Sequence, residues 1–382
     1  MMVEWKKLGE IGDVCMCKRI MKNQTFDKGD VPFYKIGTFG GNADAFINKN
    51  LFLEYKSKFS FPQKGEILLS ASGTIGRTVV YNGEDAYFQD SNIVWISNDE
   101  TQVTNAFLYY CYQIVDWKID GGTIKRLYNY NLKNTIIPIP SLSEQNRIVG
   151  ILDTFTVSID NLKEQIAQRR KQYEYYRDQL LDLEGKEGVE MKTLGEICSK
   201  LTDGSHFSPR SVEHGYYMPS VKDMTNKGFD YSNCKQISKE DYESLIRTGC
   251  KPKIHDVLIA KDGSMLKYAF PVIKDEDIVI LSSIAILTPR TKVITSAYLS
   301  HYLKCGKVKE KTIREYSSKG GVPRIILKNF KKICVCIPPL SEQQRIVDIL
   351  DHFEASIQNL EAQLSQREKQ YEYYRNKLLT FE

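Results

Sequence analysis

The chain has 382 residues, with 53 Lys and Arg against 48 Asp and Glu, so its formal net charge is only +5. Hydrophobic residues make up 42% and charged residues 26%, a composition that excludes an intrinsically disordered chain. No stretch reaches the roughly 18 consecutive apolar residues of a membrane span, and the first residues lack the apolar run of a signal peptide. We therefore expect a cytoplasmic protein.

Residues 1–140 are expected to form a globular mixed α/β domain. They open with VEWKKLGEI from Val3 and continue with short β-branched and aromatic runs separated by Gly, Asn and Asp. The runs EILLSASG from Glu66 and NIVWIS from Asn92 predict strands, and residues 105–115 predict a helix.

Residues 141–187 predict one long helix. From Ile148 to Leu183 the apolar residues alternate four and three apart, interrupted only at Arg169, which is the pattern of a coiled coil sustained for more than five heptads. Ser143 is the expected N-cap, and Gly185 is expected to end the helix. At 1.5 Å per residue such a helix spans about 60 Å.

The second half of the chain repeats the first. VEMKTLGEI from Val189 opens a second variable segment over residues 188–337, and residues 338–382 form a second copy of the helix, with Ser341 as its expected N-cap. At a constant shift of 198, 28 of 43 helix positions from Leu142 onward are identical. A regular apolar seam must be covered, and the equally long partner of each helix is the other copy.

This organisation predicts an α+β fold with a pseudo-twofold internal repeat. Two globular mixed α/β domains, 1–140 and 188–337, are separated by two long helices, 141–187 and 338–382. We expect an antiparallel coiled coil, because that arrangement lets each variable domain sit at its own end of the helix pair.

The sequence offers no catalytic or metal-binding constellation. Its nine cysteines include no C-x-x-C pair and read as reduced, buried thiols, and its five histidines include no zinc pattern. Phosphate-binding and dinucleotide-binding glycine loops are also missing. Asp203 and His206 in TDGSH could suggest acid-base chemistry, but a polar binding loop is the better interpretation. We expect no catalytic residue, no metal and no bound cofactor.

The predicted loops instead mix basic, hydroxyl and amide side chains, such as KRIMKNQ from Lys18 and KDGSMLK from Lys261. Such side chains contact phosphates and base edges. A single basic loop is more often ordinary surface, but Arg126 and Arg324 coincide under the shift of 198. The candidate DNA contacts are Arg77, Lys125 and Arg126 in the first domain and Lys222, His206, Lys261, Lys319 and Arg324 in the second.

The outer faces of the helices are also duplicated. YEYYR recurs at Tyr173 and Tyr371, outside the demands of the seam. Equivalent exterior residues suggest two docking surfaces for another protein, although a solvated face could look the same. The candidate partner contacts are Arg147, Tyr175, Arg345 and Tyr373.

The repeat and its motifs resemble the DNA specificity subunit of type I restriction-modification enzymes. The resemblance rests on IPIPSLSEQNRIV from Ile137, IPPLSEQQRIV from Ile337, GGTIKRL from Gly121 and TDGSH from Thr202, and it covers essentially the whole chain. It implies a non-catalytic subunit that binds double-stranded DNA, two adenine methyltransferase subunits and, in the full complex, motor-nuclease subunits.

The same resemblance implies that each variable domain is a target-recognition domain reading half of a split, asymmetric target. The helices would then fix the gap between the halves. S-adenosylmethionine, ATP and Mg²⁺ would bind the partner subunits, which would carry out adenine methylation and ATP-dependent cleavage.

Two other functions remain open at this point. A self-contained DNA methyltransferase would need a cofactor loop that the sequence lacks. A two-headed scaffold for proteins or sugars would need no DNA contact, and salt-dependent binding of duplex DNA separates it from a DNA reader.

Overall fold

The computed structural model describes residues 3–120, 125–318 and 323–381. The chain divides into two compact units. Unit 1 comprises residues 1–162 with 363–382, and unit 2 comprises residues 163–362. Among the described helices, none combines the length and apolarity needed to cross a membrane.

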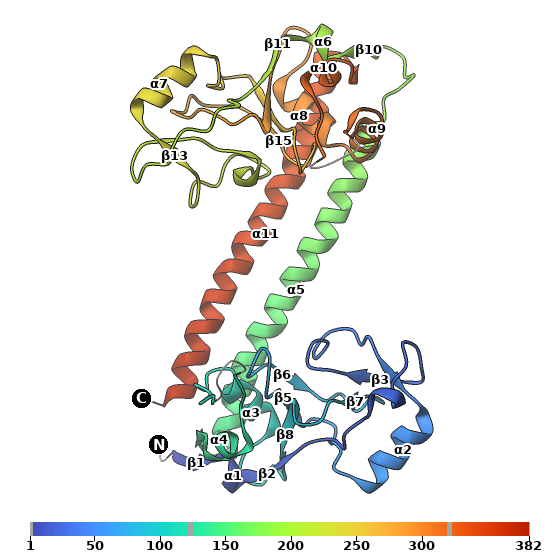
Figure 1. Cartoon of the computed structure of the whole chain (residues 1–382), viewed down its shortest axis with the longest axis vertical. Coiled ribbons are helices and arrows are strands. Elements are labelled where there is room, and N and C mark those ends of the chain that lie inside the picture. The colour runs from blue at the N-terminus through green and yellow to red at the C-terminus, as the bar shows by residue number, and fades with distance from the viewer. Residues whose placement is uncertain (1–2, 121–124, 319–322, 382) are drawn as a thin grey trace. The chain divides into compact units, whose positions relative to one another are not determined.

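Unit 1 is built around a four-stranded antiparallel sheet in the order β2-β8-β5-β6 (Figure 1). These strands are β2 (Gly12–Cys15), β8 (Ile93–Asn98), β5 (Ile67–Ser70) and β6 (Thr78–Val80). The smaller sheets are β4-β3-β7 and β1-β9, formed by β4 (Phe46–Ile47), β3 (Val31–Tyr34), β7 (Tyr87–Phe88), β1 (Glu4–Lys7) and β9 (Ile136–Ile139). Its shorter helices are α1 (Leu8–Ile11), η1 (Lys22–Gln24), α2 (Lys49–Lys58), α3 (Asn105–Tyr112) and α4 (Asn129–Asn134).

Unit 2 repeats this sheet in the order β11-β16-β14-β15. Its strands are β11 (Cys198–Asp203), β16 (Ile284–Pro289), β14 (Val257–Ala260) and β15 (Ala269–Pro271). The pairs β10-β17 and β12-β13 comprise β10 (Glu190–Thr193), β17 (Cys334–Ile337), β12 (Tyr216–Tyr217) and β13 (Gln236–Ile237). Its shorter helices are α6 (Leu194–Ile197), η2 (Val221–Asp223), α7 (Lys239–Arg247), α8 (Ser296–Lys304), α9 (Gly306–Tyr316) and α10 (Leu327–Phe330).

The long helices are α5 (Leu142–Leu180) and α11 (Leu340–Thr380). The capping prediction is wrong, because Ser143 and Ser341 both lie inside the helices. Ser141 instead accepts the first-turn bond from the Glu144 amide, at 3.4 Å. Helix α5 also ends before Gly185, which lies in the following turn with a φ of +76°.

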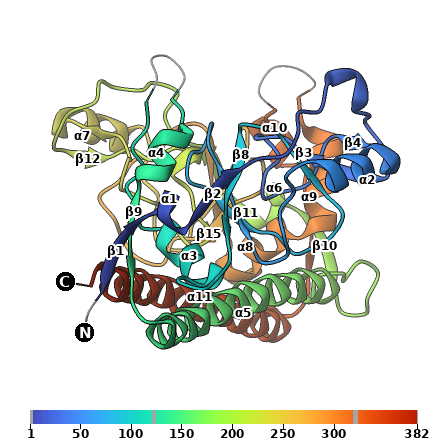
Figure 2. The same ribbon diagram turned by 90° about the horizontal axis from the view of Figure 1, so that it is seen from below.

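In each unit the two helix segments lie side by side and run antiparallel, as expected (Figure 2). In unit 1 the rings of Phe155 and Tyr374 stack at 5.4 Å and 25°. In unit 2 Tyr176 and Phe353 stack at 5.4 Å and 26°. The arginines that interrupt the heptad pattern lie over these same phenylalanines, Arg367 over Phe155 at 5.7 Å and Arg169 over Phe353 at 5.9 Å.

The core of each unit draws on both long helices. In unit 1 the start of α5 supplies Ile148 and Leu152, and the end of α11 supplies Leu379. In unit 2 the start of α11 supplies Ile346 and Leu350, and the turn directly after α5 supplies Leu181. Each globular head is therefore completed by the last turns of the helix that belongs to the other repeat.

Seven of the nine cysteines are buried and all nine are free thiols. The prediction fails at Cys334, which is exposed. Cys334 is the first residue of β17, and the three residues that follow it in the strand, Cys336 included, are buried. Among the described residues, no group of three or more His, Cys, Asp or Glu side chains is arranged to hold a metal.

Candidate nucleic-acid interface

In unit 1 the loop after β5 is tied to the segment that contains Arg126. The Leu127 amide donates to the Ala71 carbonyl at 2.9 Å, and Ser72 and Arg126 form an isolated β-bridge. The half-buried Arg126 guanidinium donates to the Ser91 carbonyl at 2.5 Å. Arg126 therefore links this loop to the turn before β8.

Unit 2 repeats the backbone pairing of this arrangement. The Ile325 amide donates to the Lys261 carbonyl at 3.2 Å, and Asp262 forms the β-bridge with Arg324. Arg324 is exposed. The equivalence of Arg126 and Arg324 inferred from the sequence shift thus corresponds to the same backbone pairing in both units.

Lys261 occupies an internal position. Its ammonium is 7% exposed and lies 3.1 Å from Asp203 Oδ2 and 3.6 Å from Asp262 Oδ1. The imidazole of His206 is 78% exposed, and its Nε2 lies 3.3 Å from the same Asp203 oxygen. The structure therefore brings these two predicted residues together through one shared carboxylate.

The other predicted contacts are dispersed. Arg77 is exposed but donates to the Phe39 carbonyl at 2.8 Å. Lys125 is exposed, and so is Lys222 in η2. Lys319 lies outside the described residues.

One arginine that sequence reasoning did not select belongs to this surface. Arg19 Nε donates to Asp90 Oδ2 at 2.9 Å, while the guanidinium remains 67% exposed. The same carboxylate accepts from the Ser91 hydroxyl at 3.1 Å. Arg19 falls in the basic segment KRIMKNQ, but only the fold reveals that Asp90 anchors it.

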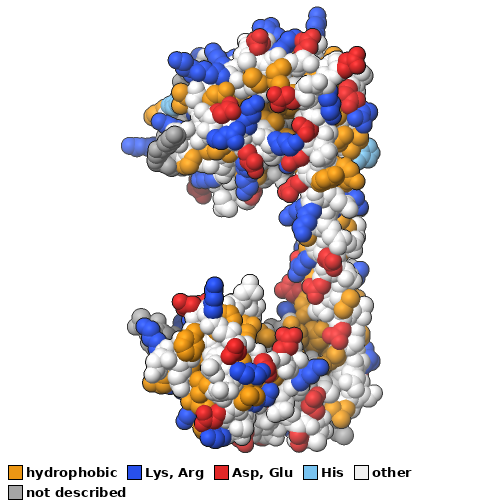
Figure 3. Space-filling model, turned by 90° about the vertical axis from the view of Figure 1, so that its right-hand side faces the viewer, with side chains coloured by type: hydrophobic (Ala, Val, Ile, Leu, Met, Phe, Trp, Pro, Cys, Tyr) orange, Lys and Arg blue, Asp and Glu red, His pale blue; other side chains and the backbone are white. Residues whose placement is uncertain are grey.

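Charge is mixed on the face of the molecule drawn in Figure 3. Figure 3 shows Lys and Arg side chains interspersed with Asp and Glu on both units. With a net charge of +5, selectivity must come from particular anchored residues more than from a large basic patch.

The predicted partner contacts occupy equivalent exposed helix positions. Arg147 pairs bidentately with Glu144 at 2.6 and 2.7 Å, and Arg345 pairs with Glu342 at 2.7 Å through both nitrogens. Each pair holds the pKa of its glutamate below the ordinary value, mainly through the hydrogen bonds from the arginine. The rings of Tyr175 and Tyr373 are exposed.

Each head is fastened to its helix by a buried glutamine of the repeated S-E-Q motif. In unit 1 Gln145 accepts from the Thr104 amide at 2.9 Å and donates to the carbonyls of Gln102 and Pro140. In unit 2 Gln343 makes the same three bonds, to Thr295, Val293 and Pro338. This joint explains why the motif is identical in the two copies.

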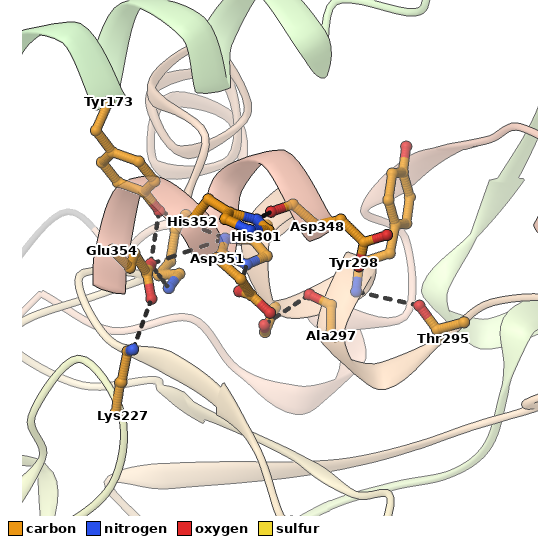
Figure 4. Close-up of polar contacts among 12 residues, drawn as sticks. Tyr173, Lys227, Thr295, Ala297, Tyr298, His301, Asp348, Asp351, His352 and Glu354 are labelled. Atoms are coloured by element: carbon orange, nitrogen blue, oxygen red, sulfur yellow. Dashed lines mark hydrogen bonds and ion pairs between the residues drawn. The ribbon is translucent and has the colours of Figure 1, made fainter. Parts of the chain in front are cut away.

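Next to that joint the units differ in chemistry. In unit 2 the buried His301 lies 2.9 Å from Asp351, and Glu354 accepts from Tyr173 at 2.8 Å and from Lys304 at 3.3 Å (Figure 4). The hydrogen bond with His301 holds the pKa of Asp351 below its ordinary value.

The corresponding contacts of unit 1 are made by less charged side chains. There Tyr110 donates to Asp153 at 2.5 Å, and Tyr371 donates to Gln113 at 2.7 Å. A shift of 191 relates the residues of α3 to those of α8, as their N-caps Thr104 and Thr295 show.

A protein-family model matches both halves of the chain. The model described as type I restriction modification DNA specificity domain matches residues 2–169 and 186–368, one copy for each half of the repeat. The chain belongs to this family. It is a specificity subunit of the type I restriction-modification kind, and its α+β fold with two domains and two long helices is the fold of that family.

Curated relatives agree with the family model. The chain is 60% identical over 181 residues to a putative type I restriction enzyme specificity subunit of Haemophilus influenzae, a match that covers 46% of this chain and 47% of that one. It therefore spans about half the length of this relative. It is 32% identical over 307 residues to the EcoR124I/EcoR124II specificity subunit of Escherichia coli, covering 75% and 73% of the two chains.

The fold is also similar to a solved structure. The type I specificity subunit of M. genitalium superposes with a TM-score of 0.58 over 99% of this chain and 96% of that one, at 16% identity. At this identity the likeness supports the fold alone.

Proposed function

We propose that this specificity subunit reads a bipartite, asymmetric DNA target. Each target-recognition domain would read one half, and the helix pair would set the unread gap between the halves. The chain itself would carry no catalytic activity.

The observation that supports this proposal is duplication with divergence. In both units a loop is joined by a β-bridge to an arginine, Ser72 to Arg126 in unit 1 and Asp262 to Arg324 in unit 2. The side chains beneath these bridges differ between the units. Equivalent frameworks with unlike side chains suit two readers of unlike sequences, because base edges are distinguished by the donors and acceptors that face them.

We also propose that the exposed faces of α5 and α11 dock two adenine methyltransferase subunits, with motor-nuclease subunits in the full complex. Arg147 with Tyr175 and Arg345 with Tyr373 are the residues proposed for these contacts. S-adenosylmethionine, ATP and Mg²⁺ would bind those partners, and the assembly would act in the cytoplasm.

Mapping of modified adenines across the genome, with and without this gene, tests the proposal. We expect methylation that depends on the gene at a target of two unlike half-sequences separated by a fixed gap. Methylation that is unchanged in its absence would contradict the proposal.

Assays of the purified chain distinguish a specificity subunit from the two alternative functions. Alone, it is expected neither to bind S-adenosylmethionine nor to methylate DNA, whereas a self-contained methyltransferase would do both. Binding of duplex DNA that weakens steeply with salt distinguishes the subunit from a scaffold for proteins or sugars.

A further inference from the structure

The strand registers relate Arg19 in unit 1 to His206 in unit 2, and both side chains are exposed. In unit 1 Val14 pairs with Ile96 and Cys15 with Trp95, and in unit 2 Leu201 pairs with Leu287 and Thr202 with Ile286. Ile96 and Leu287 are equivalent under the shift of 191, and so are Trp95 and Ile286. Their strand partners therefore correspond, and one residue further Met16 corresponds to Asp203.

Three residues further along each repeat, Arg19 of unit 1 corresponds to His206 of unit 2. The opening motifs VEWKKLGEI and VEMKTLGEI are 186 residues apart, a shift that would align Arg19 with Ser205 instead. The alignment moves by one residue because β11 contains a bulge between Cys198 and Lys200.

We propose that Arg19 and His206 are the corresponding base-reading groups of the two heads, each oriented by a carboxylate. This inference rests on the proposed function and deepens it, since it names the residues that make the two half-targets different. It further assigns Lys261 as a positioning residue that does not itself touch DNA.

The Arg19 side chain is placed to donate two hydrogen bonds to a pair of acceptors on one base. Its Nε is held by Asp90, at 2.9 Å, and no hydrogen bond or ion pair joins its two terminal nitrogens to another described residue. Asp90 is itself largely buried and also accepts from Ser91. A guanidinium fixed through Nε presents a planar pair of donors, which matches O6 and N7 of guanine in the major groove.

His206 presents different chemistry at the equivalent place. Its Nε2 faces Asp203, so only one ring nitrogen remains for a base, and a single donor or acceptor replaces the arginine fork. The two heads would therefore prefer different base pairs at equivalent positions of their half-targets.

The buried pair below His206 is not required by the fold. Asp203 and Lys261 are 9% and 7% exposed. Their counterparts in unit 1 are the half-buried Met16, which packs against the apolar core, and Ala71, which is buried in it. Burying two charges is costly, and apolar residues of suitable size often replace such pairs without loss of stability. The pair is therefore explained by what it holds, namely the carboxylate that orients His206.

Selection of duplexes from a random-sequence library tests the inference, using the full chain assembled with its methyltransferase subunits. Arg19→Lys keeps the charge but loses the fork. It is expected to lower the preference for one base pair of the first half-target about tenfold, with the second half unchanged. If the preference survives in Arg19→Lys, Arg19 contacts only phosphate and the inference is overturned for the first head.

The double variant Asp203→Met with Lys261→Ala installs the residues of unit 1 and is the matched test for unit 2. It is expected to unfold at the wild-type temperature or above, yet to lose base preference at one position of the second half-target, as His206→Ala does. An unchanged second half-target in a folded double variant would overturn the positioning role. If the wild-type assembly itself enriches no bipartite sequence, the proposed function fails, which is a different outcome.

Discussion

At the scale of single residues, Gln145 and Gln343 show why a short motif is repeated without change. Each side chain is fully buried and satisfies three backbone groups that would otherwise lack partners. A glutamine amide offers one acceptor and two donors in a fixed plane, and all three are used. The exposed neighbour Gln344 bonds only Asp348 of its own helix.

Replacing Gln343 by Leu is therefore expected to lower the free energy of unfolding of unit 2 by about 3 kcal/mol, because buried backbone groups lose their partners. Gln344→Leu is the matched control and should change it by less than about 0.5 kcal/mol. Urea unfolding followed by hydrogen exchange in residues 194–350 measures both. Equal effects of the two variants would contradict the role of the buried amide.

A second prediction concerns the exposed Arg324 at the bridge with Asp262. Arg324→Ala is expected to weaken binding of the second half-target about tenfold, because a guanidinium contact to DNA is lost. Arg314→Ala on α9 removes another exposed arginine of unit 2 and serves as the control. Competition binding with duplexes altered in one half at a time provides the measurement, and unaltered binding by Arg324→Ala would remove it from the interface.

At the scale of elements, the joint between α8 and the long helices carries charge that its counterpart on α3 lacks. Burial alone would raise the pKa of Glu354, but Lys304, His301 and Tyr173 outweigh burial and hold it below the ordinary value of 4.5. A carboxyl whose pKa is lowered by folding stabilises the native state while it is ionised. In unit 1 Thr156 stands at the corresponding helix position, under the shift of 198.

The stability of unit 2 is therefore expected to decline as the pH falls below about 4.5 and through the lower pKa that Glu354 has in the folded state. The paired change Lys304→Gln with Glu354→Thr, which installs the residues of unit 1, should reduce this decline. Unfolding free energies at about pH 6, 5, 4 and 3.5, which bracket the ordinary pKa values of carboxyl groups, measure this decline. The same dependence in wild type and variant would show that Glu354 is not responsible.

At the scale of the whole molecule, the two cores are completed by crossed helix ends. Leu379, near the C-terminus, is fully buried among residues of the first head, and Leu181 is buried among residues of the second. A change at the end of the chain should therefore affect the head formed by its beginning.

Leu379→Ala is expected to destabilise unit 1 by about 2–5 kcal/mol through loss of apolar contact and creation of a cavity. The increase in hydrogen exchange should fall in residues 8–152, far away in sequence. Leu181→Ala provides the reciprocal change, with its effect in residues 194–350. If Leu379→Ala instead loosened only its own helix, the crossed cores would be refuted.

The proposed spacing role gives a prediction at the same scale. Removing one heptad from the middle of both α5 and α11 shortens each helix by about 10 Å, or roughly three base pairs of duplex at 3.4 Å each. The tolerated gap should shorten while both half-sequences stay the same. Mapping of the methylated target reads out the result, and altered half-sequences would show that the helices do not set the gap.

The sequence by itself determined the repeat, the two long helices and the family, because these depend on periodicity and identity that are written locally along the chain. The antiparallel pairing was predicted from a different argument, that it lets each variable domain lie at its own end of the helix pair. It also selected His206, Lys261 and Arg324 as candidate DNA contacts of the second domain. The contacts of His206 and Arg324 with DNA stay predictions, whereas the Lys261 side chain is buried.

Only the tertiary structure decided which of these residues are exposed and which are buried. Lys261 turned out to be internal and His206 exposed because strand register, shifted by a bulge in β11, brings both to Asp203. Arg19 gained its anchor from Asp90, which is 71 residues away in sequence. Side-chain pairs of this kind depend on which strands meet and in which register, and no local pattern encodes that.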